Sequence, residues 1–385
     1  MRIAIFTDSF WPQINGVTIS IWNMCTELGK QGHEFLIFAP KQKNDHVMLP
    51  PHKGKITIRW LPAKPLPTYP DYLIAYSFSQ EDKQAMQNFH PDVIHVHTPF
   101  YVAKKGIEWG KKHNIPVIGT FHTLISEFLD YVPIPGLKKA KIAQKITWAY
   151  TRHFYKDCNM ITTPTQVLVD ELQEHGFKNV QVLSNGIDYD AFSKAKGKKP
   201  KGKTSIAYWG RISFEKRLDV AIDALSIVRK THPNVELTLI GYGPAETALN
   251  KQAHSLGLEK YVHFPGAKKG SEVAKEVAKH HLLVAPSPME TYGMYVLEAM
   301  AAGMGIVGCN ARAIPVALGK NERGLLFENG NATDCAEKII RLIDHPSLEK
   351  KLSTNAKKWA RAYSRKNIAK KWIELYTSII RKTQP

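Results

Sequence analysis

The chain has 385 residues, of which 43% are hydrophobic and 23% charged, a composition typical of a globular protein. It is too long for one ordinary hydrophobic core, so we expect two domains. The net charge of +19 predicts a polyanionic partner, either nucleic acid or an anionic membrane surface.

The start of the chain and its cysteines predict a cytosolic protein. The first apolar run, residues 3–6, ends at Asp8 and is too short for a signal peptide or a membrane span. The four cysteines lie far apart in no metal-like spacing, which predicts reduced thiols.

The first half of the chain alternates apolar strands with helical stretches. Residues 2–7 predict a buried parallel strand, residues 17–28 a helix and residues 34–39 a second strand. Further strands are predicted at 56–60, 93–96, 116–121, 160–163 and 180–183. This order indicates a doubly wound α/β domain, although the opening unit lacks the G-x-G-x-x-G dinucleotide fingerprint.

The lysine-rich stretch 193–203 contains Gly and Pro and has no periodicity, so we place the domain boundary there. A second α/β series follows, with strands at 205–209, 236–240, 261–264 and 282–285 and helices at 217–230, 245–256 and 271–279. Helical sequence runs from 331 onwards. We predict domains at 1–195 and 204–360, with a C-terminal helix over 361–385 packed on the first domain. Two such domains facing each other would form a ligand-binding cleft.

Two carboxylates stand out in the stretch 286–307. Glu290 lies among loop signals, whereas Glu298 falls inside a helix that Gly303 should end. The start of that helix is a natural place for a polar or anionic ligand. A buried helix with a capping Glu is the alternative.

Cations and a glycine occupy positions that favour phosphate binding. Arg211 and Lys216 follow a strand and precede a helix, which puts them at the ligand-binding end of a parallel sheet, where they suit a diphosphate. Gly16 would let a backbone N–H approach a phosphate closely. Solvated surface cations and an ordinary turn glycine are the alternatives.

Other polar motifs are less specific. His122 ends a strand and should point into the cleft, although a structural role is as plausible. His95 and His97 share a face of a strand but lack a third ligand, so no metal site is predicted. The acid pair at 188–190 follows the turn at the end of a strand, so we interpret it as part of that turn. The glycines at 241–244 lack the third glycine of a nicotinamide fingerprint, which counts against an oxidoreductase.

A basic amphipathic helix is predicted within 131–156, which contains no acidic residue. The apolar positions Ile142 and Ile146 recur at helical spacing beside aromatic residues. Together with the cations this pattern is typical of an interfacial membrane binder. The predicted membrane-binding residues are Lys138, Lys139, Lys141, Lys145, Trp148 and Arg152. A helix packed on the first domain with a solvated basic face is the alternative, and no nucleic-acid fold motif accompanies it.

In combination these motifs resemble a retaining glycosyltransferase of the GT-B fold, of the glycosyltransferase family 4 type. The resemblance rests on Gly16-Val17, Gly119-Thr-Phe-His122, Asn185-Gly-Ile-Asp188, Gly210-Arg211, Glu215-Lys216, Gly241-Tyr-Gly-Pro244 and the Glu290/Glu298 pair. Within that family, His97-Thr-Pro-Phe100 and the basic helix look most like diacylglycerol glucosyltransferases, and enzymes that mannosylate phosphatidylinositol are also similar. Arg217 departs from the family pattern, standing where a Gly is common.

The resemblance implies a set of donor-binding residues: Gly16, Arg211, Lys216, Glu290, Thr291, Tyr292, Gly293 and Glu298. Arg211 and Lys216 would hold the diphosphate and stabilise its growing charge, and Glu298 would accept hydrogen bonds from the ribose. Glu290 and His122 would contact the transferred sugar, so the implied catalytic residues are His122, Glu290, Arg211 and Lys216. No covalent nucleophile is evident, which implies a front-face displacement with retention.

We therefore expect a peripheral enzyme on the inner face of the cell membrane that transfers a hexose to a lipid. UDP-glucose is the expected donor and diacylglycerol the expected acceptor, with no tightly bound cofactor, no metal and no nucleic acid. A mannosyltransferase using GDP-mannose and a transferase with a soluble acceptor stay open, as does a basic nucleic-acid-binding α/β protein without catalysis.

Overall fold

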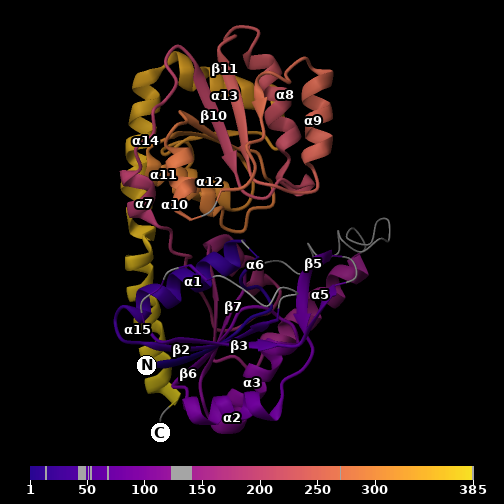
Figure 1. Ribbon diagram of the computed structural model, residues 1–385, viewed down its shortest axis with the longest axis vertical. Helices are drawn as coiled ribbons and strands as arrows, with labels where there is room; N and C mark the ends of the chain where they lie inside the picture. Colours follow the sequence, from indigo (N-terminus) through magenta and orange to yellow (C-terminus); the bar gives the residue numbers. More distant parts are fainter. Residues whose placement is uncertain are drawn as a thin grey trace. The chain divides into compact units, whose positions relative to one another are not determined.

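The computed structural model describes residues 1–13, 15–41, 49–50, 52, 54–66, 69–122, 141–268 and 270–383. The chain divides into two compact units, the first formed by Met1–Gly186 with Arg365–Pro385 and the second by Ile187–Ser364. Each unit contains a parallel β-sheet with helices packed on it (Figure 1). The predicted α/β class with two doubly wound sheets is confirmed.

The first unit is built on a seven-stranded parallel sheet of order β3-β2-β1-β6-β7-β8-β9. Its strands are β1 (Arg2–Phe6), β2 (Glu34–Pro40), β3 (Ile56–Leu61), β6 (Val93–Val96), β7 (Val117–Thr120), β8 (Met160–Thr163) and β9 (Val180–Val182). Its helices are α1 (Gly16–Gly29), α2 (Gln80–Phe89), α3 (Tyr101–His113), α5 (Lys141–Tyr155), α6 (Gln166–Glu174) and α15 (Arg365–Thr383). The strand order reverses between β1 and β6, the topological switch point at which such sheets bind ligands.

A two-stranded antiparallel hairpin, β4 (Ala63–Leu66) and β5 (Tyr69–Ala75), was not predicted. Pro65 and Pro70 lie within it, and proline usually argues against a strand because it cannot donate to the ladder. The hairpin tolerates them because both strands of a two-stranded sheet are edge strands, where proline is accepted.

The second unit is built on a six-stranded parallel sheet of order β12-β11-β10-β13-β14-β15. Its strands are β10 (Thr204–Trp209), β11 (Val235–Ile240), β12 (Val262–His263), β13 (Leu282–Ala285), β14 (Gly305–Cys309) and β15 (Leu325–Phe327). Its helices are α7 (Tyr189–Lys194), α8 (Leu218–Val228), α9 (Glu246–Ser255), α10 (Ser271–Val277), α11 (Met294–Ala302), α12 (Ala313–Leu318), α13 (Ala332–Asp344) and α14 (Pro346–Ala360). The lysine-rich stretch suggested as a domain boundary lies inside this unit, where it leads from α7 to β10.

The chain leaves the first unit at Gly186 and returns to it at Arg365. A Cβ on Gly186 would lie 2.6 Å from the Cα of Arg365, so this close passage of the two segments requires glycine. After the return, α15 packs on α1 (Figure 1). The Arg365 guanidinium lies 3.0 Å from Glu27 Oε1.

All four cysteines are buried and unbridged. Within the described ranges, no helix has both the length and the apolar character that crossing a lipid bilayer requires.

Candidate active site

Lys216 and Glu290 are in direct contact in the second unit. Lys216 ends the 3-10 turn Phe214–Lys216 that follows β10, and Glu290 lies in the loop between β13 and α11. The Lys216 Nζ donates a hydrogen bond of 2.8 Å to Glu290 Oε1. Their side chains are 22% and 9% exposed, so the ion pair is largely removed from solvent. A cation and a carboxylate predicted to serve one ligand therefore meet at the end of the sheet.

Glycines allow the loop that carries Arg211 to pack closely on its neighbour. A Cβ on Gly241 would lie 1.9 Å from the Gly210 carbonyl oxygen, and one on Gly243 would lie 2.2 Å from that of Ile212. The Gly210 and Ile212 N–H groups donate to backbone carbonyls of the segment 240–242. Arg211 is thus held on a rigid loop at the carboxyl end of β10, as its position in the sequence predicts.

The helix α11 begins at the loop predicted to bind a sugar. Gly293 has φ +72°, a left-handed conformation that glycine adopts without strain, and directs the chain from the loop into the helix. The Ala313 N–H donates to the Glu290 carbonyl oxygen at 3.2 Å, which fixes the loop backbone. Thr291 is partly exposed and Tyr292 is buried beside it. As predicted, Gly303 ends the helix in a left-handed conformation.

Glu298 lies inside α11 and pairs with an aromatic donor. The Trp209 Nε1–H donates a hydrogen bond of 2.7 Å to Glu298 Oε2. Enclosure of the carboxyl by protein raises its pKa to about 7; the Trp209 hydrogen bond opposes this rise and the charge of Asp188 adds to it. Asp188 itself caps the N-terminus of α7, with its Oδ1 accepting from the Ala191 N–H at 3.1 Å, rather than forming a simple turn.

Three aromatic rings pack together in the second unit, and one of them, Trp209, contacts Glu298. Tyr295 contacts both Tyr208 and Trp209, with ring centroids 5.2 and 6.2 Å apart. Burial raises the pKa of the Tyr208 hydroxyl, Glu290 raises it further, and Arg211 opposes the shift. The charges of Glu290 and Arg211 thus both act on the Tyr208 hydroxyl, in opposite directions.

In the first unit, His122 belongs to a buried cluster of histidines at the carboxyl ends of β6 and β7. Its Nε2 lies 2.9 Å from His97 Nδ1, and the His97 and His95 rings are 3.9 Å apart. His95 in turn contacts the Tyr376 hydroxyl of α15 at 2.7 Å and Thr120 Oγ1 at 2.6 Å. Burial lowers the pKa of His122 to about 3, so its imidazole is neutral at physiological pH. Among the described residues, no three His, Cys, Asp or Glu side chains are grouped to hold a metal ion.

Asp8 is a buried carboxyl at the same edge of that sheet. Its Oδ1 accepts from the Ala75 N–H at 3.1 Å and its Oδ2 from Thr98 Oγ1 at 3.0 Å. Burial raises its pKa to about 7 against these two hydrogen bonds. Asp8 thereby joins the end of β1 to the β4–β5 hairpin and to the loop that carries His97.

Most of the described residues predicted to bind the membrane are exposed on α5. Ile142, Ile146 and Tyr150 of α5 are 74%, 64% and 48% exposed, and they follow one another at four-residue intervals. Lys141, Lys145 and Arg152 are exposed as well. Lys138 and Lys139 lie outside the described residues.

Trp148, predicted to face the membrane with these residues, instead packs inwards. Its ring stacks on that of His175 at 3.8 Å and lies against Phe121 of the core. The reason is its position on α5, since it lies three residues before the buried Thr151 and seven before the buried Tyr155, on the face that meets the sheet.

Gly16 is the first residue of α1, where helix N–H groups lack partners within the helix. The Asn15 side chain caps this helix by accepting from the Thr18 N–H at 3.0 Å. Gly16 and His122 belong to the first unit, whereas the other predicted donor-binding residues belong to the second.

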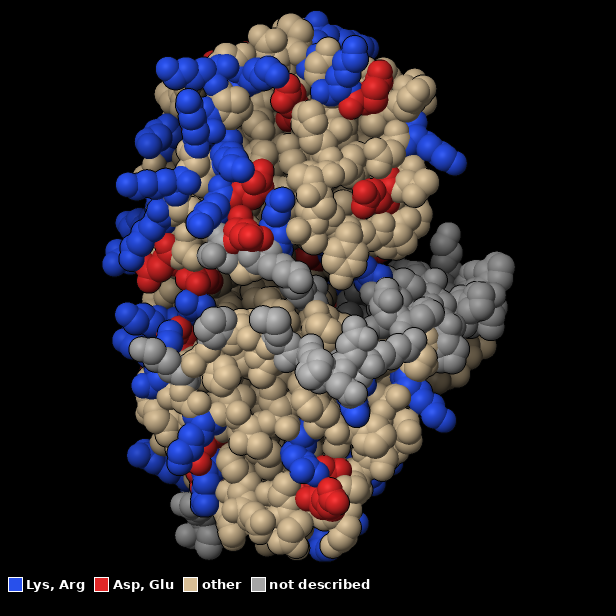
Figure 2. All heavy atoms as spheres, in the orientation of Figure 1, with Lys and Arg blue, Asp and Glu red and all other residues tan. Residues whose placement is uncertain are grey.

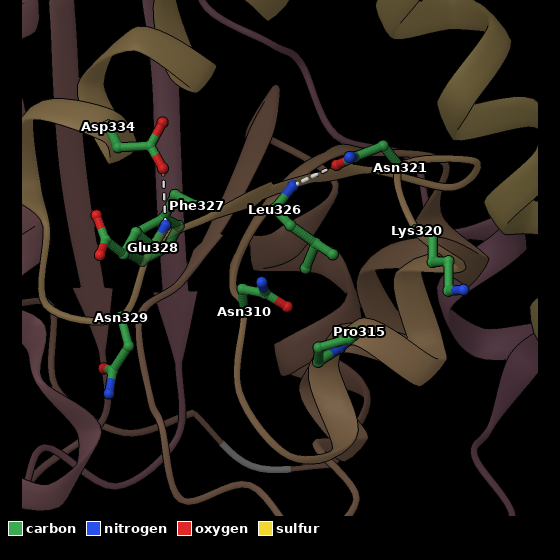
Figure 3. Close-up of a pocket in the computed structure, with 9 residues that line it drawn as sticks. All are labelled: Asn310, Pro315, Lys320, Asn321, Leu326, Phe327, Glu328, Asn329 and Asp334. Carbon is green, nitrogen blue, oxygen red and sulfur yellow. Dashed lines mark hydrogen bonds between the residues drawn. The ribbon is translucent and has the colours of Figure 1, made fainter.

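A hollow of about 660 Å³ lies further along the carboxyl edge of the second sheet, next to β14 and β15 (Figure 3). Two of its polar side chains hold backbone N–H groups in and just after β15: Asn321 accepts from the Leu326 N–H and Asp334 from the Glu328 N–H, each at 2.7 Å. No residue predicted to bind the donor lines this hollow. We therefore centre the candidate site on the Lys216–Glu290 pair.

Sequence reasoning missed Trp209, Tyr295 and the His95–Tyr376 contact. Each depends on a partner far along the chain, 89 residues away for Trp209 and 281 for His95. Their closeness in sequence to predicted site residues could have indicated the two aromatic residues: Trp209 lies two residues before Arg211, and Tyr295 lies two residues after Gly293.

Two family descriptions together match most of the chain. Residues 14–191 match Glycosyltransferase Family 4, and residues 190–359 match Glycosyl transferases group 1. The boundary between the matches falls within a few residues of the point at which the chain enters the second unit.

Individual relatives and a solved structure agree with this result. The chain is 28% identical to the alpha-monoglucosyldiacylglycerol synthase of Streptococcus pneumoniae, over 80% of the chain and 70% of the relative. It is 27% identical to the enzyme of that name from Acholeplasma laidlawii, over 99% of the chain and 98% of the relative. A GDP-mannose-dependent alpha-mannosyltransferase of Corynebacterium glutamicum is 25% identical, over 85% of the chain and 77% of the relative. The crystal structure of Anabaena HepE in complex with UDP has the same fold, with a TM-score of 0.75 at 16% identity over 98% of this chain and 100% of that one.

Proposed function

This chain belongs to the glycosyltransferases of the GT-B fold, and on that premise we propose that it transfers a hexose from a nucleotide sugar to a membrane lipid. The main support is the pair of alpha-monoglucosyldiacylglycerol synthases, one of which matches the chain over nearly its whole length. Their name specifies one glucose on diacylglycerol, so we take UDP-glucose as the donor and diacylglycerol as the acceptor.

We assign donor binding in the second unit to the groups around the Lys216–Glu290 contact. Arg211 and Lys216 supply positive charge for the diphosphate, and this charge gains importance as the bond to the sugar breaks and the leaving group becomes more negative. Glu290 accepts a hydrogen bond from a hydroxyl of the transferred sugar, and the N–H groups of 291–293 help to place it. Glu298 accepts hydrogen bonds from the ribose.

In this scheme Lys216 and Glu290 orient each other. A 2.8 Å contact in a largely buried position keeps the ammonium group at the mouth of the sheet before the donor arrives. Such preorganisation reduces the reorganisation that the protein must undergo in the transition state. Gly16 of the first unit would add a backbone N–H to the phosphates.

We propose that His122 contacts the sugar as a neutral imidazole. Burial lowers its pKa to about 3, so it cannot serve as a cationic acid at physiological pH, although it can still form a hydrogen bond to a hydroxyl. With no obvious covalent nucleophile, the scheme is a front-face displacement in which the leaving phosphate accepts the acceptor's proton. The α configuration of the donor is then retained, in keeping with the "alpha" in the names of the relatives.

We propose that the exposed face of α5 binds the membrane. Two isoleucines with most of their side chains in solvent, one turn apart and flanked by lysines, suit the boundary between lipid headgroups and acyl chains. Tyr150 is tied to the protein, since its hydroxyl donates to the Pro99 carbonyl at 2.7 Å, so Ile142 and Ile146 would enter the lipid.

Positive charge beyond α5 would assist this encounter. Figure 2 shows Lys and Arg side chains gathered over α14, whose Lys350, Lys351 and Lys358 are exposed. A broad positive field attracts the protein to an anionic surface but weakens with salt, because ions screen exposed charges over roughly 10 Å at 0.1 M.

Product formation tests the proposal. The purified chain is incubated with UDP-glucose, UDP-galactose or GDP-mannose, and with diacylglycerol, phosphatidylinositol or a soluble sugar, in mixed micelles. We expect a glucolipid from UDP-glucose and diacylglycerol, with an α linkage by proton NMR. A β linkage would refute retention, and transfer only to the soluble sugar would refute the lipid acceptor.

Vesicle flotation tests the membrane surface separately. Ile142→Ser/Ile146→Ser should reduce binding to anionic vesicles at every salt concentration, since it removes apolar contact and leaves the net charge unchanged. The matched control is Leu256→Ser, at a residue of the second unit that is 42% exposed. Equal flotation of the double variant and the control would refute the assignment of α5.

A mannosyltransferase is the second candidate, because the GDP-mannose-dependent relative matches 85% of the chain at nearly the same identity. The same donor panel decides between the two candidates, since a mannosyltransferase should form product with GDP-mannose and little with UDP-glucose.

A further inference from the structure

Trp209 holds one oxygen of Glu298 and leaves the other available. The indole is 5% exposed at the end of β10, and its N–H can only donate. It donates to Glu298 Oε2 at 2.7 Å. Among the residues that the structure describes, none donates a hydrogen bond to Oε1, and Glu298 keeps some exposure to solvent. The Trp209 hydrogen bond therefore distinguishes the two oxygens of Glu298.

We propose that Trp209 is a positioning residue for the nucleotide, which orients Glu298 so that Oε1 accepts hydrogen bonds from the hydroxyls of the ribose. This inference rests on the proposed function, because it takes Glu298 to be the residue that contacts the donor. It adds a residue that has no direct contact with the ligand and acts only through the carboxylate.

The hydrogen bond also affects the charge of Glu298. An ionised carboxylate accepts at both oxygens, whereas a protonated one carries a hydrogen that turns one oxygen into a donor. Enclosure raises the pKa of this carboxyl to about 7, so its ionised fraction changes near neutral pH, and the Trp209 bond favours the ionised form.

Charged groups also lie on the helices packed against α11, among them the exposed Asp190–Lys194 ion pair of α7. Asp188, before α7, acts on Glu298 and raises its pKa. On α14, Lys357 and Glu349 lie beside Gly303 and Gly305, beyond the C-terminal end of the helix. On α10, Glu276 is paired with Lys279 at 2.6 Å.

Trp209→Phe isolates the hydrogen bond. Phenylalanine keeps an aromatic ring beside Tyr295 and deletes the indole N–H that donates to Glu298. Without that donor the pKa of Glu298 rises, and hydrogen bonds to charged groups are strong enough to shift a pKa by about one unit. The pH below which nucleotide affinity declines should therefore move upwards by about one unit.

The experiment measures Kd by calorimetry for UDP and for 2′,3′-dideoxy-UDP between pH 6 and pH 9, with GDP as a second probe. For Trp209→Phe we expect UDP affinity to fall about tenfold at pH 6.5 and less at pH 8.5, since both proteins are then ionised at Glu298. Dideoxy-UDP should bind the wild type and the variant almost equally, because it lacks the hydroxyls that Oε1 would receive.

Two controls accompany the variant. Glu298→Gln should bind UDP weakly with no inflection near pH 7. Trp359→Phe removes another tryptophan of the same unit, on α14, and should leave both affinity and pH profile unchanged. Thermal melting of each variant checks that the fold persists.

An unchanged pH profile and affinity in Trp209→Phe, with weakened binding in Glu298→Gln, would overturn the positioning role. Equal wild-type affinity for UDP and dideoxy-UDP would overturn it too, while leaving the proposed transfer reaction intact. The proposed function fails by a different result, namely that neither UDP nor GDP binds and no donor yields product.

Discussion

The two partners of the Lys216–Glu290 ion pair should differ in how much stability is lost when each is replaced. In Lys216→Met the Glu290 carboxylate, only 9% exposed, loses its partner and cannot regain water. In Glu290→Gln the Lys216 ammonium, 22% exposed on a flexible stem, can turn towards solvent. The lysine substitution should therefore be the more destabilising of the two.

The magnitude follows from burial. Breaking a fully buried pair by removing one partner costs about 3–5 kcal/mol. Because this pair keeps some exposure, we expect about 2 kcal/mol for Lys216→Met and about 1 kcal/mol for Glu290→Gln. In the double variant no unpaired charge remains, so its loss should be smaller than the sum by about 1–2 kcal/mol. For a unit of this size, 2 kcal/mol corresponds to a Tm lower by roughly 4–8 °C.

Differential scanning calorimetry of the three variants and the wild type gives this cycle, and transfer assays run alongside it. Lys194→Met is the matched control, since its ion pair with Asp190 lies in the same unit with side chains 76% and 65% exposed. Such an exposed pair should contribute under about 0.5 kcal/mol. All variants at positions 216 and 290 should lose transfer. Additive stability losses would refute the coupling, and full activity in either single variant would refute the site.

Three further predictions concern the backbone, the buried histidines and the thiols. Gly293→Ala should lower the free energy of unfolding by about 1–2 kcal/mol, because alanine is strained at φ +72°, and Gly293→Asn should lower it less; equal stability of all three in urea would contradict this. Burial lowers the pKa values of His95, His97 and His122 below the ordinary 6.5, so at pH 5.5 the unfolded state binds up to three more protons at these residues than the folded state. Burial raises the pKa of Asp8 to about 7, so the folded state binds one more proton there. The balance of about two protons predicts that the free energy of unfolding of the first unit falls by roughly 2–3 kcal/mol for each pH unit below 6.5. A free energy of unfolding, measured in urea, that stays constant between pH 5 and 6.5 would be inconsistent with this prediction. All four cysteines are buried, so a thiol reagent at pH 7.5 should label them only after unfolding, and rapid labelling of the native protein would count against their burial.

The sequence predicted the main sheets because their strands are buried on both faces. Continuous apolar runs such as those of β1, β2 and β6 leave little ambiguity once they are separated by helical stretches. The strand β14 was missed because its sequence, Gly-Ile-Val-Gly-Cys, follows the helix-ending Gly303 without an intervening loop signal. The β4–β5 hairpin was missed because proline within its strands argues against a strand.

The site was predictable where a single segment carries the information. The loop position of Glu290 and the helical position of Glu298 follow from local glycine and proline signals, and both are confirmed. The contact between Lys216 and Glu290, 74 residues apart, depends instead on the adjacency of β10 and β13. Local patterns do not encode which strands lie side by side, so neither this pair nor the Trp209 bond could be read from the sequence.

The return of the chain to the first unit at Arg365 makes the second unit an insertion within the first. During synthesis the ribosome must therefore finish Ile187–Ser364 before it makes α15. Until then the α1 surface that α15 covers stays open, and His95 lacks the Tyr376 hydroxyl. The nascent chain thus contains all of the second unit before the first unit is complete, whereas domains usually become complete in order from the N-terminus.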